Sequence, residues 1–174
     1  MNDSKKGSQM ITSKKLSLRT FILLFITSIS ALLIDQLTKI LAVENLPLHT
    51  PVSVCPFFNL FLTYNKGVSF SMFSSTDPAT PIYLSLMGLF ICLLVLYWMI
   101  KESDFLIKIG LAYILGGAIG NIIDRIRLGH VIDFLDVYYK NSHWPAFNGA
   151  DSFICLGAFI IFIRIFFTKE GDKK

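Results

Sequence analysis

Four long runs of apolar residues constrain this chain more than any other feature of its sequence. They cover about residues 16–38, 81–100, 105–124 and 151–168, and the second run contains no charged side chain. A helix needs about 20 residues to cross a hydrocarbon core of about 30 Å. A soluble protein can bury one such run in its core, but four runs in 174 residues would leave no polar surface. The runs therefore predict four membrane-spanning helices.

The composition agrees with this prediction and excludes several classes of protein. Hydrophobic residues make up 53% of the chain and charged residues only 16%, against about 25% in soluble domains. This excludes a disordered protein, a water-soluble enzyme and a module that binds nucleic acid through a basic face. The three cysteines, Cys55, Cys92 and Cys155, are an odd number, so no disulfide framework is expected.

The basic residues predict the orientation of the spans. They gather before the first span, around the link between the second and third, and near the end of the chain: Lys5, Lys6, Lys14, Lys15, Arg19, Lys101, Lys108, Arg164, Lys169, Lys173 and Lys174. The positive-inside rule then places both termini and that link in the cytoplasm. We expect a disordered cytoplasmic tail at 1–15, one domain at 16–168 and a cytoplasmic tail at 169–174. A cleaved signal peptide is disfavoured, because the first run ends in DQLTK and not in small residues.

Two loops then lie on the extracytoplasmic side, at about 39–80 and 124–150. In the first, residues 57–64 are strand formers, and an Asn-Lys-Gly turn separates them from the alternating segment 68–72, which predicts a β-hairpin. The second is rich in aromatic residues, which suits a segment along the outer membrane surface. The predicted fold is an all-α membrane protein with four transmembrane helices and a small extracytoplasmic β-cradle.

Polar residues at the outer ends of the spans need a partner or a function, because polar groups near hydrocarbon are costly. Asp35 and Lys39 are four residues apart, which fits either a helix-end ion pair or a functional contact. Asn121, Asp124 and Arg125 share one helix face, just after a Gly116–Gly120 pair that allows close helix packing.

Two further aspartates lie in apolar surroundings at a similar membrane depth. Asp133 stands between Ile132 and Phe134, and Asp151 opens the fourth run, where it also fits a helix N-cap. Two carboxyl groups around one water share a proton, since both cannot ionise readily. The ionised group can then activate water while the protonated group polarises a carbonyl. A metal site that includes His130 and Asp133 is disfavoured because no further His or Cys ligand motif accompanies them, so neither a metal nor a cofactor is expected.

Two other functions fit the composition. A small transporter or proton relay would also place carboxylates in the membrane, but it predicts them near mid-membrane together with a repeat. An anchoring or assembly subunit would use the glycine-rich face of the third span for helix contacts.

Five motifs in order resemble those of the lipoprotein signal peptidase family, also called signal peptidase II, which are membrane aspartic endopeptidases of bacteria. They are DQLTK (35–39), NKGVSF (65–70), GNIIDR (120–125), VIDF (131–134) and FNGAD (147–151). The resemblance implies that Asp133 and Asp151 are the catalytic pair. It assigns substrate-binding or supporting roles to nine others: Asp35, Lys39, Asn65, Gly67, Asn121, Asp124, Arg125, Asn148 and Ala150.

The resemblance also implies cleavage of prolipoproteins just before a diacylglyceryl-modified cysteine, and inhibition by the cyclic peptide globomycin. The expected location is the bacterial cytoplasmic membrane, with the active site at the extracytoplasmic interface, and the expected partners are the prolipoprotein substrate and membrane lipids. A monomer is expected. Asp124 competes with Asp133 for the catalytic role, but its neighbour Arg125 is expected to hold it ionised, which is unsuited to sharing a proton.

Overall fold

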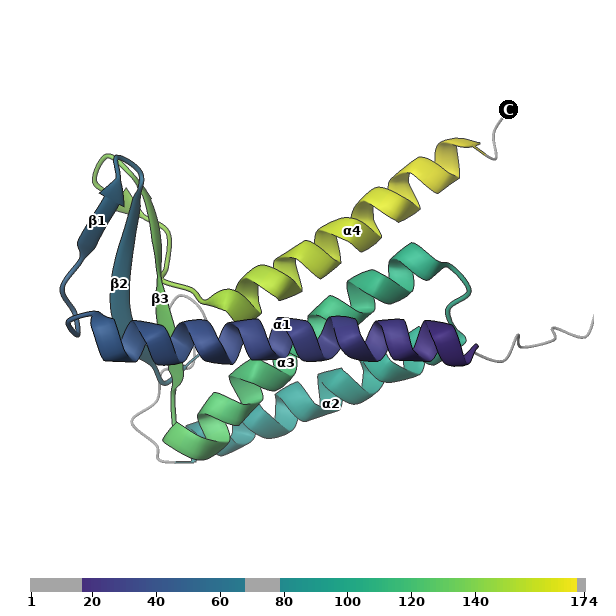
Figure 1. Cartoon of the computed structure of the whole chain (residues 1–174), viewed down its shortest axis with the longest axis horizontal. Coiled ribbons are helices and arrows are strands. Elements are labelled where there is room, and N and C mark those ends of the chain that lie inside the picture. The colour runs from purple at the N-terminus through teal and green to yellow at the C-terminus, as the bar shows by residue number, and fades with distance from the viewer. Residues whose placement is uncertain (1–16, 68–78, 172–174) are drawn as a thin grey trace, which may run out of the picture.

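A computed structural model describes residues 17–67 and 79–171 as four long helices with a small β-sheet at one end (Figure 1). Each helix is long and apolar enough to cross a membrane, which confirms the predicted fold class. The predicted tail at 1–15 and the alternating segment 68–72 lie outside the described residues. The helices are α1 (Leu18–Asn45), α2 (Thr80–Lys101), α3 (Phe105–Leu128) and α4 (Gly149–Gly171).

Three of the helices extend further than the apolar runs predicted. α4 continues past residue 168 to Gly171, into the predicted tail. At the other end of the bundle, α1 continues past residue 38 to Asn45, and α3 continues past residue 124 to Leu128. Gly129 ends α3 in the left-handed conformation, with φ 76°, and its N–H donates to the carbonyl of Arg125 at 3.0 Å. α1 and α3 therefore carry polar residues beyond their apolar lengths, at the end where the sheet lies.

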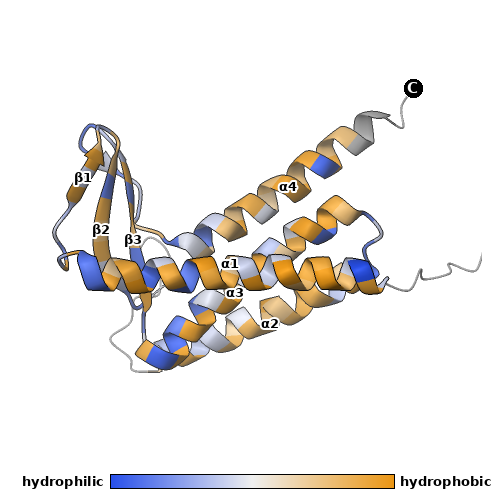
Figure 2. Cartoon of the chain, viewed as in Figure 1, coloured by the Kyte–Doolittle hydropathy of each residue, from blue (hydrophilic) through white to orange (hydrophobic). Residues whose placement is uncertain are grey.

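α3 is the central helix and packs against each of the other three. Most apolar side chains of α1, α2 and α4 remain exposed, as expected of lipid-facing helices. Figure 2 shows how far hydrophobic residues, in orange, extend along these helices. The approach of α3 to α1 depends on Gly116, because a Cβ there would collide with the carbonyl oxygen of Ser28. This confirms the predicted close packing at the glycine pair.

The sheet has four antiparallel strands, in the spatial order β1 (Val52–Cys55), β2 (Phe58–Asn65), β3 (Val131–Tyr139) and β4 (Ser142–His143). β2 confirms the strand predicted at 57–64. The second outer loop, for which the sequence predicted no strand, contributes β3 and β4 to the sheet. In the sheet, Asp133 lies opposite Thr63, which is 70 positions earlier in the chain, and a local sequence pattern cannot predict strand pairing at that separation.

One face of the sheet packs on the end of α1. Leu62, Ile132 and Phe134 form an apolar cluster with Ala42 of α1. Because side chains alternate along a strand, Asp133 points away from this cluster. The apolar neighbours of Asp133 in the sequence thus hold the strand in place, while its carboxylate faces the helix ends.

Candidate active site

The ammonium of Lys39 lies at the centre of a buried polar cluster between α1 and α3. Lys39 is only 1% exposed. Its Nζ lies 2.9 Å from Oδ2 of Asp35, 3.0 Å from Oδ1 of Asn121 and 2.7 Å from Oδ2 of Asp124. The three protons of an ammonium thus meet three acceptors, which offsets the cost of burying the charge. The alternative of an exposed helix-end ion pair is excluded.

Asp35 joins α1 to the start of α4. It is fully buried, and its Oδ1 accepts the backbone N–H of Ala150 at 2.7 Å while its Oδ2 accepts Lys39. Ala150 itself is 0% exposed. There is room for this contact only because residue 120 is a glycine, since a Cβ there would collide with Oδ2 of Asp35.

Asp124 is held by partners other than the one expected from the sequence. Its Oδ2 contacts Lys39 and accepts the backbone N–H of Ile132 at 3.4 Å, and its Oδ1 accepts Nε2 of Gln36 at 3.0 Å. No ion pair joins Asp124 to Arg125 in the part of the chain that the structure describes, because successive side chains on a helix do not face each other, and Asp124 pairs with Lys39 instead. Lys39 thus supplies the cation that Asp124 meets.

Arg125 connects α3 to the turn that follows β2. Its guanidinium donates to the carbonyls of Gly67 at 3.2 Å and Asn121 at 3.3 Å. The N–H of Gly67 in turn donates to Oδ1 of Asn65 at 3.0 Å. This chain of contacts orients the Asn65 amide, whose Nδ2 donates to Oδ2 of Asp133 at 3.0 Å.

The start of α4 forms a reciprocal cap between Asn148 and Asp151. Oδ1 of Asn148 accepts the N–H of Asp151 at 3.0 Å, and Oδ2 of Asp151 accepts the N–H of Asn148 at 3.3 Å. This is the geometry of a capping box. Asp151 is therefore not the N-cap that its sequence position suggested, since Asn148 takes that place. The carboxylate of Asp151 remains directed away from the helix.

Asn148 also joins Asp151 to Asp133. It is fully buried, and its Nδ2 donates to Oδ1 of Asp133 at 2.7 Å and to Oδ1 of Asn121 at 3.2 Å. Nδ2 of Asn121 donates to Oδ1 of Asp151 at 2.9 Å. The two aspartates thus share Asn148 as a common partner, which brings a strand residue and a helix residue to one place.

The environment of Asp133 favours its protonated form. Asp133 is 2% exposed. Burial raises the pKa of its carboxyl group, and the negative charge of Asp151 raises it further, to about 7, although hydrogen bonds from Asn65 and Asn148 act in the opposite direction. A carboxyl group with this pKa can hold or release a proton near neutral pH.

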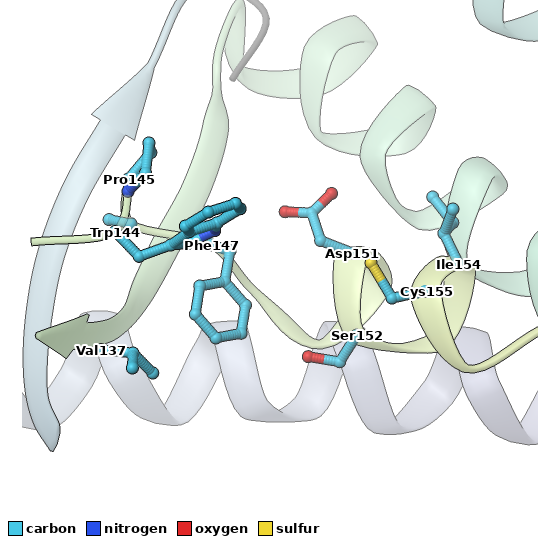
Figure 3. A pocket seen from close by; sticks show the side chains of 9 residues that line it. Val137, Trp144, Pro145, Phe147, Asp151, Ser152, Ile154 and Cys155 are labelled. Carbon is cyan, nitrogen blue, oxygen red and sulfur yellow. The ribbon is translucent and has the colours of Figure 1, made fainter. Parts of the chain in front are cut away.

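An apolar cavity of ≈ 660 Å³ adjoins Asp151. Figure 3 shows Trp144, Pro145 and Phe147 on the sheet side of this cavity and Ile154 and Cys155 of α4 on the other side. Asp151 contributes the carboxylate among otherwise mainly apolar lining residues. The cavity can therefore place an apolar group next to an acidic one.

The structure brings together all eleven residues singled out from the sequence. Arg125 and Gly67 lie at the edge of the hydrogen-bond network. The other nine residues form the network itself: Asp35, Lys39, Asn65, Asn121, Asp124, Asp133, Asn148, Ala150 and Asp151. Gln36, which bridges Asp35 and Asp124, was missed because a glutamine beside an aspartate carries no signal of its own. His130 does not join the network, and its ring lies 4.3 Å from that of Tyr64. Over 17–67 and 79–171, no three His, Cys, Asp or Glu side chains converge as metal ligands would.

The fold and the site together define a polytopic membrane protein of four spans, with a buried acidic site beside an apolar cavity at the sheet end. A model of the signal peptidase (SPase) II family matches residues 27–167, and the chain belongs to this family.

Individual known proteins are similar to this chain over most of its length. The lipoprotein signal peptidase of Aeromonas hydrophila is 43% identical over 146 residues, which cover 82% of this chain and 87% of that protein. The lipoprotein signal peptidase of Polynucleobacter necessarius is 42% identical over 164 residues, covering 92% and 99%. Among solved structures, a bacterial membrane enzyme determined by the in meso method at 2.3 Å resolution has a TM-score of 0.76 at 26% identity, and the match covers 93% of this chain and 96% of that one.

Proposed function

We propose that this chain removes signal peptides from bacterial prolipoproteins, and that it does so as an aspartic endopeptidase with Asp133 and Asp151 as the catalytic pair. Family membership and the named relatives support the peptidase activity. The observation that carries the mechanism is the shared network, in which Asn148 bonds to both Asp133 and Asp151, Asn121 donates to Asp151, and Asp151 lines the apolar cavity.

In this mechanism the pair holds one proton. Asp133 carries it, because burial and the charge of Asp151 favour its neutral form, and Asp151 remains ionised. Asp151 takes a proton from a water molecule, whose oxygen attacks the scissile carbonyl carbon, while the Asp133 hydroxyl donates a hydrogen bond to the carbonyl oxygen. When the C–N bond breaks, a protonated carboxyl group supplies the leaving amine with its proton. Asn65 and Asn148 orient Asp133 throughout.

The apolar cavity suits the lipidated substrate. Cleavage immediately before a diacylglyceryl-modified cysteine requires space for apolar groups beside the carboxylates, and the lining from Trp144 to Cys155 supplies it. The distribution of basic residues supports an extracytoplasmic site in the bacterial cytoplasmic membrane. All residues of the site come from one chain, so a monomer suffices. The proposal includes closure over the substrate by the turn around Asn65 and by the loop around Trp144, as well as inhibition by globomycin.

Asparagine substitutions test the catalytic pair. Asp133→Asn and Asp151→Asn keep the side-chain volume but remove the ionisable group, so each should lower cleavage of a diacylated lipobox peptide by about 10²–10⁴-fold or more. The purified variants are assayed with EDTA present, and binding of the same peptide should persist. Asp104→Asn is the matched control, because Asp104 pairs with Arg164 in the link before α3, apart from the site, and its variant should cleave at the wild-type rate.

The same experiment decides between Asp133 and Asp124. Near-wild-type turnover by Asp133→Asn, together with an inactive but folded Asp124→Asn, would transfer the catalytic role to Asp124. Loss of wild-type activity in EDTA would contradict the metal-free mechanism.

A further inference from the structure

A second buried carboxylate lies on β3, outside the network of the proposed catalytic pair. Asp136 is 5% exposed. Its Oδ2 accepts Nδ2 of Asn59 on β2 at 2.9 Å, and its two oxygens lie 2.9 and 3.0 Å from Nδ1 of His143 on β4. The His143 ring stacks on Tyr138, with 5.1 Å between the ring centroids. Because a carboxylate only accepts, Nδ1 of His143 carries the hydrogen in this pair.

His143 directly precedes the segment that forms one wall of the apolar cavity. Trp144, Pro145, Ala146 and Phe147 line the cavity together with Asp151 (Figure 3). This segment belongs to no helix or regular strand. Its backbone is held at the two ends, where the N–H of Trp144 donates to Val137 at 2.8 Å and Phe147 exchanges hydrogen bonds with Leu135 at 2.9 and 3.0 Å.

The wall has open space on both sides. A second cavity of ≈ 380 Å³ is lined by Trp144, Pro145 and Ala146, by Asp136 and His143, and by Pro51 and Phe61. A segment between two cavities has little packing to fix it, so its position depends on the contacts at its ends. The contact between the buried Asp136 and the half-exposed His143 is such a contact, and it lies immediately before Trp144.

We propose that Asp136, held by Asn59 and bonded to His143, is a positioning residue that fixes the 144–147 wall of the substrate cavity and thereby sets how tightly the apolar part of the substrate binds. Asp136 acts through His143 and Trp144. Removing it loosens the wall while the network of Asp133 and Asp151 stays intact. The inference rests on the proposed function in taking the diacylated peptide as the occupant of the cavity.

Steady-state kinetics give the first test. Asp136→Ala and His143→Ala should each raise KM for the diacylated peptide about tenfold with kcat within about twofold of wild type, the pattern of lost substrate binding. The double variant should be no worse than either single one, because both remove the same contact. Asp136→Asn should keep KM close to the wild-type value, since its amide can donate a hydrogen bond to the tautomer of His143 that has no hydrogen on Nδ1. Ser142→Ala, the exposed neighbour on β4, should leave KM unchanged.

Tryptophan fluorescence gives the second test, independent of cleavage. The chain has two tryptophans, so Trp98→Phe leaves Trp144 as a single reporter on the wall. In this background with Asp133→Asn, the diacylated peptide should change the Trp144 emission, and adding Asp136→Ala should weaken the measured Kd about tenfold. Thermal unfolding checks that each variant is folded.

Three results would overturn the inference: folded Asp136→Ala with unchanged KM and Kd, a fall in kcat alone, or folded Asp136→Asn as impaired as Asp136→Ala. The two proposals fail separately. If wild-type protein binds the peptide without cleaving it, the proposed function falls, and a weaker Kd in Asp136→Ala still supports the wall.

Discussion

Around Asp133, two opposing influences determine the protonation state of one carboxyl group. Burial and the charge of Asp151 favour the neutral acid, while amide donors from Asn65 and Asn148 favour the carboxylate. The balance brings the pKa to about 7. Each amide therefore positions the group and also limits how far its pKa rises.

The pH dependence of cleavage follows from this balance. If the protonated form of Asp133 is the active one, kcat/KM should fall as the pH rises through about 7. Asn65→Ala removes a donor that stabilises the carboxylate, so the pKa rises and the fall in kcat/KM should move to higher pH. A pH profile of both proteins measures the shift, whatever the absolute rate of the variant. A fall displaced to lower pH would contradict the assignment.

The identities of the site residues could be predicted from the sequence, but their pairings could not. Lys39 was expected to meet Asp35 because the two are one helical turn apart, whereas its contacts with Asn121 and Asp124 cross between helices more than 80 positions apart. The sequence suggested an ion pair between the neighbours Asp124 and Arg125, whereas in the structure Asp124 pairs with Lys39 of α1.

At the level of the elements, α3 positions the site through its glycines. Gly116 lets α3 approach α1, and Gly120 leaves room for the Asp35 carboxylate that bonds to Ala150 on α4. The same face that packs the helices thus ends in the acidic network. The hydropathy and the glycine spacing of α3 could be predicted from the sequence, and so could strand β2. Strand β3 could not be predicted, because its partner strand lies in the other outer loop and because its apolar residues also fit a segment at the membrane interface.

Adding a methyl group at Gly120 should therefore disrupt the site. In Gly120→Ala, the new Cβ displaces the Asp35 carboxylate, and we expect a loss of about 1–3 kcal/mol of stability together with impaired cleavage. Thermal unfolding in detergent and the peptide assay measure the two effects. Gly88→Ala on α2 is the control, because its Cβ meets only the Ile122 side chain, at 3.1 Å, and the higher helix propensity of alanine, about 0.8–1.0 kcal/mol, offsets that contact. Equal losses in both variants would contradict the specific role of Gly120.

At the scale of the whole molecule, the two ends of the helix bundle differ in chemistry. The sheet lies at one end, whereas the start of α1 and the α2–α3 link lie at the other (Figures 1 and 2). The buried acidic network lies at the sheet end, because it includes Asp133 of β3. Asp104 and Arg164 form an ion pair at 2.6 Å that joins this link to α4. The sequence predicted the division because basic residues cluster in the segments that the fold places at this second end.

The positive-inside rule turns this division into an orientation that can be measured. In a cysteine-free background, Asn141→Cys places a thiol in the turn between β3 and β4, and Ser103→Cys places one in the α2–α3 link, both at exposed positions. A membrane-impermeant maleimide added to intact spheroplasts should label the first and leave the second unlabelled until the membrane is permeabilised. Both variants should retain cleavage, which shows that the labelled protein is folded. The reverse labelling pattern would put the acidic site in the cytoplasm, where a translocated prolipoprotein could not reach it, and the proposed function would fail together with the orientation.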